Sequence, residues 1–197
     1  MEVYGEFLIL SGAWIQTIGA AIASIGNTIV ASNEADSLME DIGGDLYVIG
    51  NGVEATGNSL QAIGRSSLTS NENETFGTLG AWLQSAGNIA NVLGGSGIVT
   101  GTDEEALNID IMGDIIQSAG AAFEAKSSSI SEAFYAELIT TGQTIQSFAI
   151  AIEAIGLLYV KNGNKKMGQQ ILAIGSYGQT AGAAIAAIGF TKEYYEH

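Results

Sequence analysis

The chain has 197 residues, a formal net charge of −15 and neither cysteine nor proline. The length suits one domain with a sizeable core, so we expect residues 1–197 to form a single unit. Without cysteine, disulfides and thiolate chemistry are excluded, and the acidic balance argues against nucleic acids and anionic membrane surfaces as partners.

Six helices are predicted, because aliphatic residues recur at alternating spacings of three and four through most of the chain. The first is expected over 3–31, followed by an acidic turn, and the second over 37–65. A polar loop at 66–75 precedes the third helix at 75–94, which a glycine-rich stretch ends. The fourth is expected over 104–126. A capping box formed by Ser129 and Glu132 would start the fifth, 130–160. An Asn/Gly turn with three lysines leads to the sixth, 166–190.

One eight-residue pattern, G-x-x-x-Q-x-x-G, recurs within these segments. It occupies residues 12–19, 57–64, 80–87, 113–120 and 175–182, and a copy at 142–149 has alanine in place of the last glycine. Such repetition is typical of a repeat protein. The residues that we expect to set helix packing and assembly are Gly12, Gln16, Gly19, Gly57, Gln61, Gly64, Gly80, Trp82, Gln84, Gly87, Gly113, Gln117, Gly120, Gly142, Gln146, Gly175, Gln179 and Gly182.

Glycine also recurs every seventh residue beyond the pattern. Inside a helix it costs about 0.8–1 kcal/mol relative to alanine, so these glycines must gain close approach of another backbone. In heptad terms the aliphatic residues occupy positions a and d and form the expected packing seam, with glycine at e and glutamine at b beside it. The glutamines are interpreted as bridges that hold register between helices, with a ligand-binding ladder as the alternative.

These features predict an all-α fold of six antiparallel helices, either a bundle or a flat helical array. Only 14% of residues are charged and 47% are hydrophobic. The apolar arc of each helix is wide enough to need neighbours on two sides. We therefore expect other subunits, or lipid, to cover part of the surface.

Catalytic and metal sites are not expected. The one histidine, His197, is the last residue, so no catalytic triad can be built. Two acidic groups, one at 103–110 and one at 40–45, are read as solvated helix surfaces, although a cation site is the alternative. The lysines at 161, 165 and 166 are expected to meet the acidic face of a neighbour rather than to bind phosphate. We predict a protein that is not an enzyme and needs no cofactor or metal.

Membrane insertion is the second hypothesis. Residues 7–33, 75–102 and 167–191 are uncharged and long enough to span a bilayer. Other features favour a protein outside the membrane. Gln, Asn, Ser and Thr are frequent in these segments, and the second, fourth and fifth helices carry acidic residues. There is no aromatic belt with basic flanks, and the chain starts with an acidic residue.

The phrases at 80–88 and 57–64, GAWLQSAGN and GNSLQAIG, resemble repetitive proteins of Bacillus-type spore-forming bacteria built from G-N-x-L-Q-A-x-G units, a family of unknown function. The resemblance covers nearly the whole chain. It implies a bacterial, cytoplasmic, non-enzymatic protein associated with sporulation, in the mother cell or spore. The leading hypothesis is a structural protein that self-assembles into filaments, sheets or other homo-oligomers; the alternative is a membrane-embedded or membrane-active protein, such as a pore or toxin.

Overall fold

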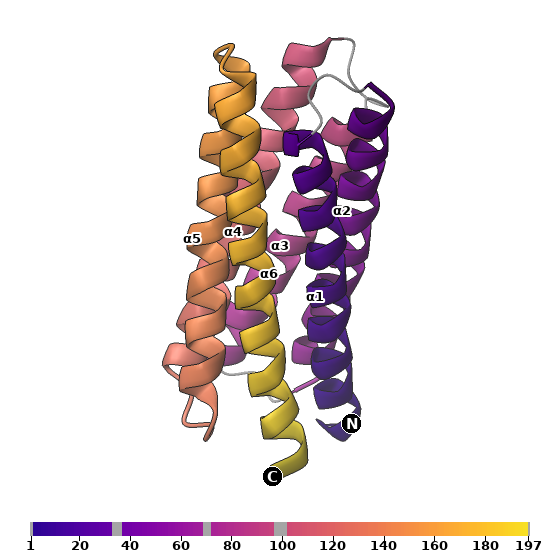
Figure 1. Cartoon of the computed structure of the whole chain (residues 1–197). Coiled ribbons are helices and arrows are strands. Elements are labelled where there is room, and N and C mark those ends of the chain that lie inside the picture. Colours follow the sequence, from indigo (N-terminus) through magenta and orange to yellow (C-terminus); the bar gives the residue numbers. More distant parts are fainter. Residues whose placement is uncertain (1, 33–36, 69–71, 97–101, 197) are drawn as a thin grey trace.

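The computed structural model describes residues 2–32, 37–68, 72–96 and 102–196, and within them the chain is helical in six segments (Figure 1). The expected all-α class and the expected number of helices are confirmed. The helices are α1 (Glu2–Ser32), α2 (Ser37–Ser66), α3 (Glu72–Ser96), α4 (Asp103–Ser129), α5 (Ala136–Lys161) and α6 (Lys165–Glu196). Most of the acidic turn expected after the first helix, most of the connection expected between the third and fourth helices, part of the expected loop at 66–75, and His197 lie outside the described residues.

The helices form a closed ring. Each contacts the one before and the one after it in the chain, and α1 also contacts α6. Successive helices run in opposite directions (Figure 1). In the first pair, Gly12, Gly19 and Gly26 of α1 approach Gly57, Gly50 and Gly43 of α2 in turn. Both chain ends lie at one end of this barrel, which we call the terminal end; the turn between α5 and α6 lies at the opposite end (Figure 1). The arrangement is a closed bundle, one of the two expected forms, and the flat array is not seen.

Two helix boundaries differ from the sequence prediction. Helix α5 begins at Ala136 rather than at 130, and Ser129 instead ends α4, with its hydroxyl donating to the carbonyl of Lys126. The predicted capping box of Ser129 and Glu132 is therefore wrong. Helix α6 runs on to Glu196 rather than stopping at 190. By contrast, the tight turn between α5 and α6 lies where expected, and Gly163 there has a φ of 84°, which favours glycine.

Three helix pairs are packed backbone against backbone: α1 with α2, α3 with α4, and α5 with α6. An added Cβ at Gly57 would lie 2.5 Å from the carbonyl oxygen of Gly12, and one at Gly87 would lie 2.5 Å from that of Gly113. In the third pair, a Cβ at Gly182 would lie 2.6 Å from the carbonyl oxygen of Gly142. Real Cβ atoms do not come this close, so only glycine permits these helix separations.

The aliphatic residues that were expected to form the packing seam lie on the outside of the barrel instead. Aliphatic residues one position before the glycines, including Ile18, Ile25 and Ile49, are about half exposed on the outside of the barrel. The glycines lie between paired helices, and the glutamines point into the barrel. The error has a physical cause: the 3-4 spacing identifies an apolar stripe but does not say what covers it.

Candidate functional site

The interior of the barrel is polar. Among the described residues, only Ile150 is apolar among the twelve largest fully buried side chains; the others are glutamine, asparagine and glutamate. Most of the buried hydrophobic residues are alanines, which line the contacts between helices. A water-soluble domain normally has the reverse arrangement, with large apolar side chains inside. The polar interior is therefore the feature that needs a functional explanation.

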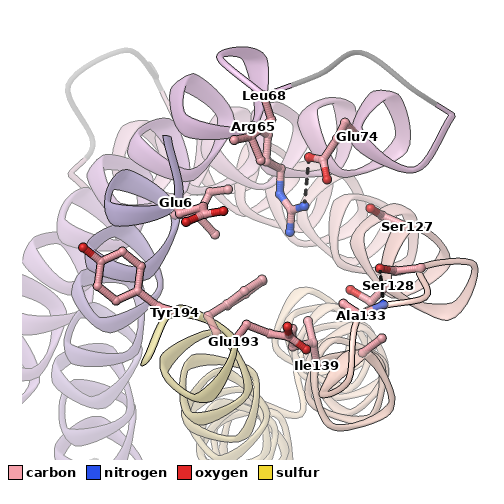
Figure 2. Close-up of a pocket in the computed structure, with 14 residues that line it drawn as sticks. Glu6, Arg65, Leu68, Glu74, Ser127, Ser128, Ala133, Ile139, Glu193 and Tyr194 are labelled. Carbon is pink, nitrogen blue, oxygen red and sulfur yellow. Dashed lines mark hydrogen bonds and ion pairs between the residues drawn. The ribbon is translucent and has the colours of Figure 1, made fainter. Parts of the chain in front are cut away.

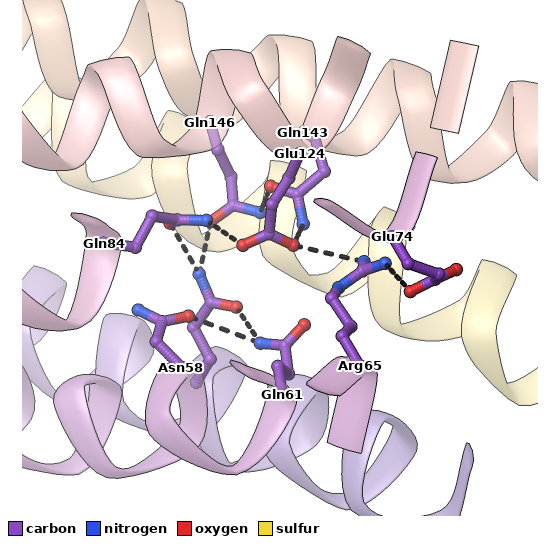
Figure 3. Close-up of polar contacts among 9 residues, drawn as sticks. Asn58, Gln61, Arg65, Glu74, Gln84, Glu124, Gln143 and Gln146 are labelled. Atoms are coloured by element: carbon purple, nitrogen blue, oxygen red, sulfur yellow. Dashed lines mark hydrogen bonds and ion pairs between the residues drawn. The ribbon is translucent and has the colours of Figure 1, made fainter. Parts of the chain in front are cut away.

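A layer of hydrogen-bonded amides crosses the middle of the barrel (Figure 3). The Nε2 of Gln16 on α1 lies 3.1 Å from Oε1 of Gln84 on α3 and 2.8 Å from Oε1 of Gln146 on α5. From α2, Nε2 of Gln61 donates to Oε1 of Gln16 at 2.8 Å. Four helices thus meet at the barrel axis through amides. These four glutamines were predicted to bridge helices; the structure places them inside the barrel, bonded to one another.

Arg65 and Glu124 lie beside this layer, toward the terminal end. Glu124 on α4 accepts from Nε2 of Gln84 at 2.7 Å and from Nε2 of Gln143 at 3.1 Å. Its Oε2 lies 3.4 Å from Nη2 of Arg65, and the guanidinium also pairs with Glu74 at 3.6 Å (Figure 3). Gly77 on α3 makes room for the guanidinium, because a Cβ there would lie 2.6 Å from Nη1 of Arg65.

Buried carboxylates fill the interior on the other side of the amide layer. Glu54 of α2 accepts from Nε2 of Gln179 on α6 at 2.7 Å, and Asp114 of α4 accepts from Nδ2 of Asn91 on α3 at 2.8 Å. Asp110 and Glu153 are also buried. The described residues include no group of three or more His, Cys, Asp or Glu side chains that could hold a metal ion. This part of the barrel is thus rich in acceptors, and Arg65, the one buried basic residue of the described part, lies on the other side of the layer.

A cavity of about 220 Å³ opens at the terminal end of the barrel. Figure 2 shows the guanidinium of Arg65 reaching into it, with Ser127 and Ser128 on the α4 side and Glu6 on the α1 side. Glu193 of α6 also lines the cavity and accepts a hydrogen bond from the backbone of Tyr135. Apolar walls come from Leu68, Ile139, Phe190 and Tyr194, among others.

The outside of the barrel is apolar between two charged rims. Within helix residues 7–32, 46–66, 75–96, 106–125, 138–160 and 167–191, every charged side chain is buried, namely Glu54, Arg65, Asp110, Asp114, Glu124 and Glu153. In α4, where the exposed charges come closest together, Glu105 and Lys126 are about 30 Å apart along the helix axis. We call this surface the apolar belt.

Hydroxyl groups in and beside the apolar belt are bonded to their own helices. The hydroxyls of Thr28, Thr56, Thr141 and Thr144 each donate to the carbonyl four residues earlier, at 2.7 to 3.0 Å. Such bonds satisfy a hydroxyl without water. Trp14 on the belt donates from Nε1 to Oγ1 of Thr191 at 3.0 Å.

Aromatic side chains gather at the rim of the terminal end. Tyr4, Phe134 and Tyr195 are 65%, 80% and 74% exposed and come from three separate parts of the chain. Phe7, half exposed, lies beside Tyr194, with ring centroids 6.5 Å apart. This cluster was not predicted from the sequence, because its members lie far apart along the chain.

The predicted packing residues divide into three groups. The glycines lie between paired helices, and the glutamines, including Gln117 and Gln179, line the interior. Trp82 is on the belt, 46% exposed. That Arg65 and the carboxylates are buried together inside the barrel was not predicted from the sequence. The spacing of the carboxylates could have indicated it, because Glu54, Glu124 and Glu153 occupy the same heptad position as the glutamines.

The charged groups singled out from the sequence lie at the opposite end of the barrel. Lys161 lies 3.7 Å from Glu104 of α4, and Lys165 pairs with Glu40 of α2 at 2.5 Å. Asp41, Asp45, Asp103 and Glu105 are exposed, whereas Asp110 points into the barrel and is buried. Lys161 and Lys165 thus meet acidic residues of their own chain.

A family of unknown function, DUF6944, matches residues 7–187, and the chain belongs to it. No curated protein matches the sequence, and no solved structure matches the fold. The polar interior, the cavity and the apolar belt are therefore the features of the molecule that bear on its function.

Proposed function

We propose that this DUF6944 protein is an integral membrane protein whose six helices span the bilayer and enclose a polar interior. The observation that carries the proposal is the apolar belt, on which all six helices lack an exposed charge. A bilayer has a hydrocarbon core about 30 Å thick, which fits the distance between Glu105 and Lys126. Each large apolar side chain gains about 1.5–3 kcal/mol on full burial, so contact with lipid is strongly favoured over contact with water.

Other features of the barrel agree with a lipid environment. Membrane helices pack through small residues, as the glycine pairs do here. Charged residues within membrane helices face the interior and pair with polar groups, as Glu54 and Glu124 do. Threonine hydroxyls on the belt bond to their own backbone, and tyrosines and phenylalanines gather at one rim. The acidic residues that favoured a protein outside the membrane lie inside the barrel or on its rims.

Hydropathy alone identifies only some of the expected spans. Within the described residues, α1 from Tyr4 onward, α5 and α6 are long and apolar enough to cross a membrane. The belt faces of α2, α3 and α4 are equally free of charge, but their inward faces carry many amides and carboxylates. The mean hydropathy of a helix averages its apolar and polar sides. These three helices therefore have a lower mean hydropathy, although the same lipid would cover their outer faces.

Self-assembly without lipid is the second candidate. On α2, the exposed residues Ile42, Ile49 and Ile63 lie on a seven-residue spacing, and so do Ile18 and Ile25 on α1. Such straight apolar stripes can pack against helices of another copy. A cytoplasmic filament or sheet, with the sporulation role that the sequence resemblance implies, would use these stripes as its interfaces.

Membrane fractionation tests the proposal. Full-length protein is expressed in bacteria, and the membranes are washed with alkaline carbonate and floated with lipid vesicles. We expect the protein to resist carbonate, to float and to need detergent for extraction. Detergent-free protein that runs as a monomer contradicts this proposal, and detergent-free fibres or sheets in negative-stain micrographs support self-assembly instead.

A matched pair of variants makes the test specific to the belt. Ile115→Lys puts a charge in the middle of the belt on α4, where Ile115 is 50% exposed. Glu132→Lys puts the same side chain at the terminal rim. A lysine at the centre of a membrane helix costs about 2.5–3.5 kcal/mol. We expect Ile115→Lys to lower the membrane-integrated fraction strongly and Glu132→Lys to leave it unchanged; equal integration of the two variants contradicts the proposal.

A further inference from the structure

The cavity at the terminal end is lined by opposite charges on different walls. Arg65 enters from α2, near the buried Ser127 and Ser128 of α4 (Figure 2). Glu6 comes from α1 on another side of the same cavity. The volume of about 220 Å³ is enough for a small organic molecule, and the cavity lies at the terminal end of the barrel.

The arginine has donor capacity that the protein leaves unused. Arg65 is 5% exposed, and its Nε has no hydrogen-bond partner among the described residues. Its ion pairs with Glu74 and Glu124 measure 3.6 and 3.4 Å, whereas charge-assisted hydrogen bonds are typically about 2.7–2.9 Å. A buried N–H without an acceptor is unfavourable, so the site favours a ligand that brings an acceptor such as a carboxylate.

The charges around the cavity disfavour a simple anion, and a simple cation brings no acceptor for Arg65. A free anion near Arg65 would meet the carboxylates of Glu6, Glu74 and Glu193, which also line the cavity. A free cation near Glu6 would leave the Nε of Arg65 without an acceptor. A molecule that carries both charges satisfies both walls, and discrimination of this kind comes from repulsion as much as from attraction. The apolar side chains of Leu68, Ile139 and Phe190 leave space for an aliphatic group.

We propose that this cavity binds a small zwitterion of the free amino-acid class, with its carboxylate at Arg65 and its ammonium group at Glu6. This activity goes beyond membrane insertion and does not depend on it, because the cavity is formed within a single chain. Ser127 and Ser128 supply hydroxyls on the wall near Arg65, and Phe190, whose ring centroid lies 5.5 Å from the guanidinium carbon, helps to hold that side chain in place.

Calorimetry on the purified full chain in mild detergent tests the proposal. The probes are L-leucine, 4-methylpentanoate, which lacks the ammonium group, and 3-methylbutylamine, which lacks the carboxylate. We expect L-leucine to bind at least tenfold more tightly than either of the other two. No binding of L-leucine, or equal binding of a probe with one charge, overturns the proposal.

Two glutamate variants test the position of the ammonium group. Glu6→Gln removes a charge from the cavity wall, and Glu132→Gln removes one from an exposed residue near the same end that does not line the cavity. We expect L-leucine to bind about tenfold more weakly to Glu6→Gln and with unchanged affinity to Glu132→Gln. Equal affinity in both variants overturns the proposal. Flotation of the same variants is independent of this result, so failure here is distinguishable from failure of the membrane proposal.

Discussion

Close packing of α1 against α2 can be tested with two glycines of one helix. In Gly50→Ala, the new Cβ would lie 2.5 Å from the backbone nitrogen of Ala23 and 2.7 Å from the carbonyl oxygen of Gly19. Both contacts are with backbone atoms, so the helices must move apart. In Gly44→Ala, six residues earlier, the new Cβ has no atom within 4 Å.

The size of the effect follows from two opposing terms. Overpacking costs typically 1–3 kcal/mol, and we take about 3 kcal/mol because rigid backbone is in the way. Alanine is better than glycine inside a helix by about 1 kcal/mol. Gly50→Ala should therefore destabilise the fold by about 2 kcal/mol, and Gly44→Ala should stabilise it by about 1 kcal/mol.

Thermal unfolding followed by circular dichroism in detergent measures this difference. In a chain of this length, 1 kcal/mol corresponds to roughly 2–4 °C in Tm. We expect the Tm of Gly50→Ala to be about 6–12 °C below that of Gly44→Ala, with the wild type between them. If both variants shift Tm upward by the same amount, the glycines do not serve close approach of the helices, and the reasoning is refuted.

Three further predictions concern the interior and the belt. Gln16→Leu removes the amide that donates to Oε1 of Gln84 and to Oε1 of Gln146, and at about 1–3 kcal/mol for each buried acceptor left without a donor we expect a loss of at least 2 kcal/mol in the free energy of unfolding, measured by denaturant titration. Arg65→Met leaves Glu124 buried without its cation and should cost about 3–5 kcal/mol, whereas the double variant with Glu124→Gln should recover most of the lost Tm. Ile49→Lys should reduce flotation with vesicles, with full flotation of this variant as the contrary result.

The sequence predicted the helices well and their surroundings poorly. The 3-4 spacing and the absence of proline placed six helices with most ends within three residues, because helix formation depends on local pattern. The start of α5 was missed by six residues, since Ser129 and Glu132 fit a capping box that the chain does not use. Local capping signals can be overridden by the path that the chain must take between packed helices.

The candidate site depended on information that a local pattern does not contain. The heptad position of Gln16 and Gln84 was recognised, but the sequence did not say which side of a helix faces the barrel axis. The assumption that aliphatic residues lie inside put Ile18 in the core, whereas the structure puts Gln16 there. The cavity was out of reach of the sequence, because it combines Glu6, Arg65 and Glu193, which lie far apart along the chain.

The distribution of apolar residues around the barrel helps to separate lipid from self-assembly. A filament or sheet buries one or two faces of each subunit and leaves the remaining faces in water, where charged side chains are favoured. Here no helix presents an exposed charge between the rims, and the large exposed side chains include Ile18 on α1, Ile49 on α2, Trp82 on α3, Ile115 on α4 and Ile152 on α5. Lipid surrounds a membrane protein on all sides and applies the same constraint to every helix. An apolar belt that closes around the whole barrel therefore favours a bilayer over copies of the chain, and it accounts for polar side chains being gathered inside.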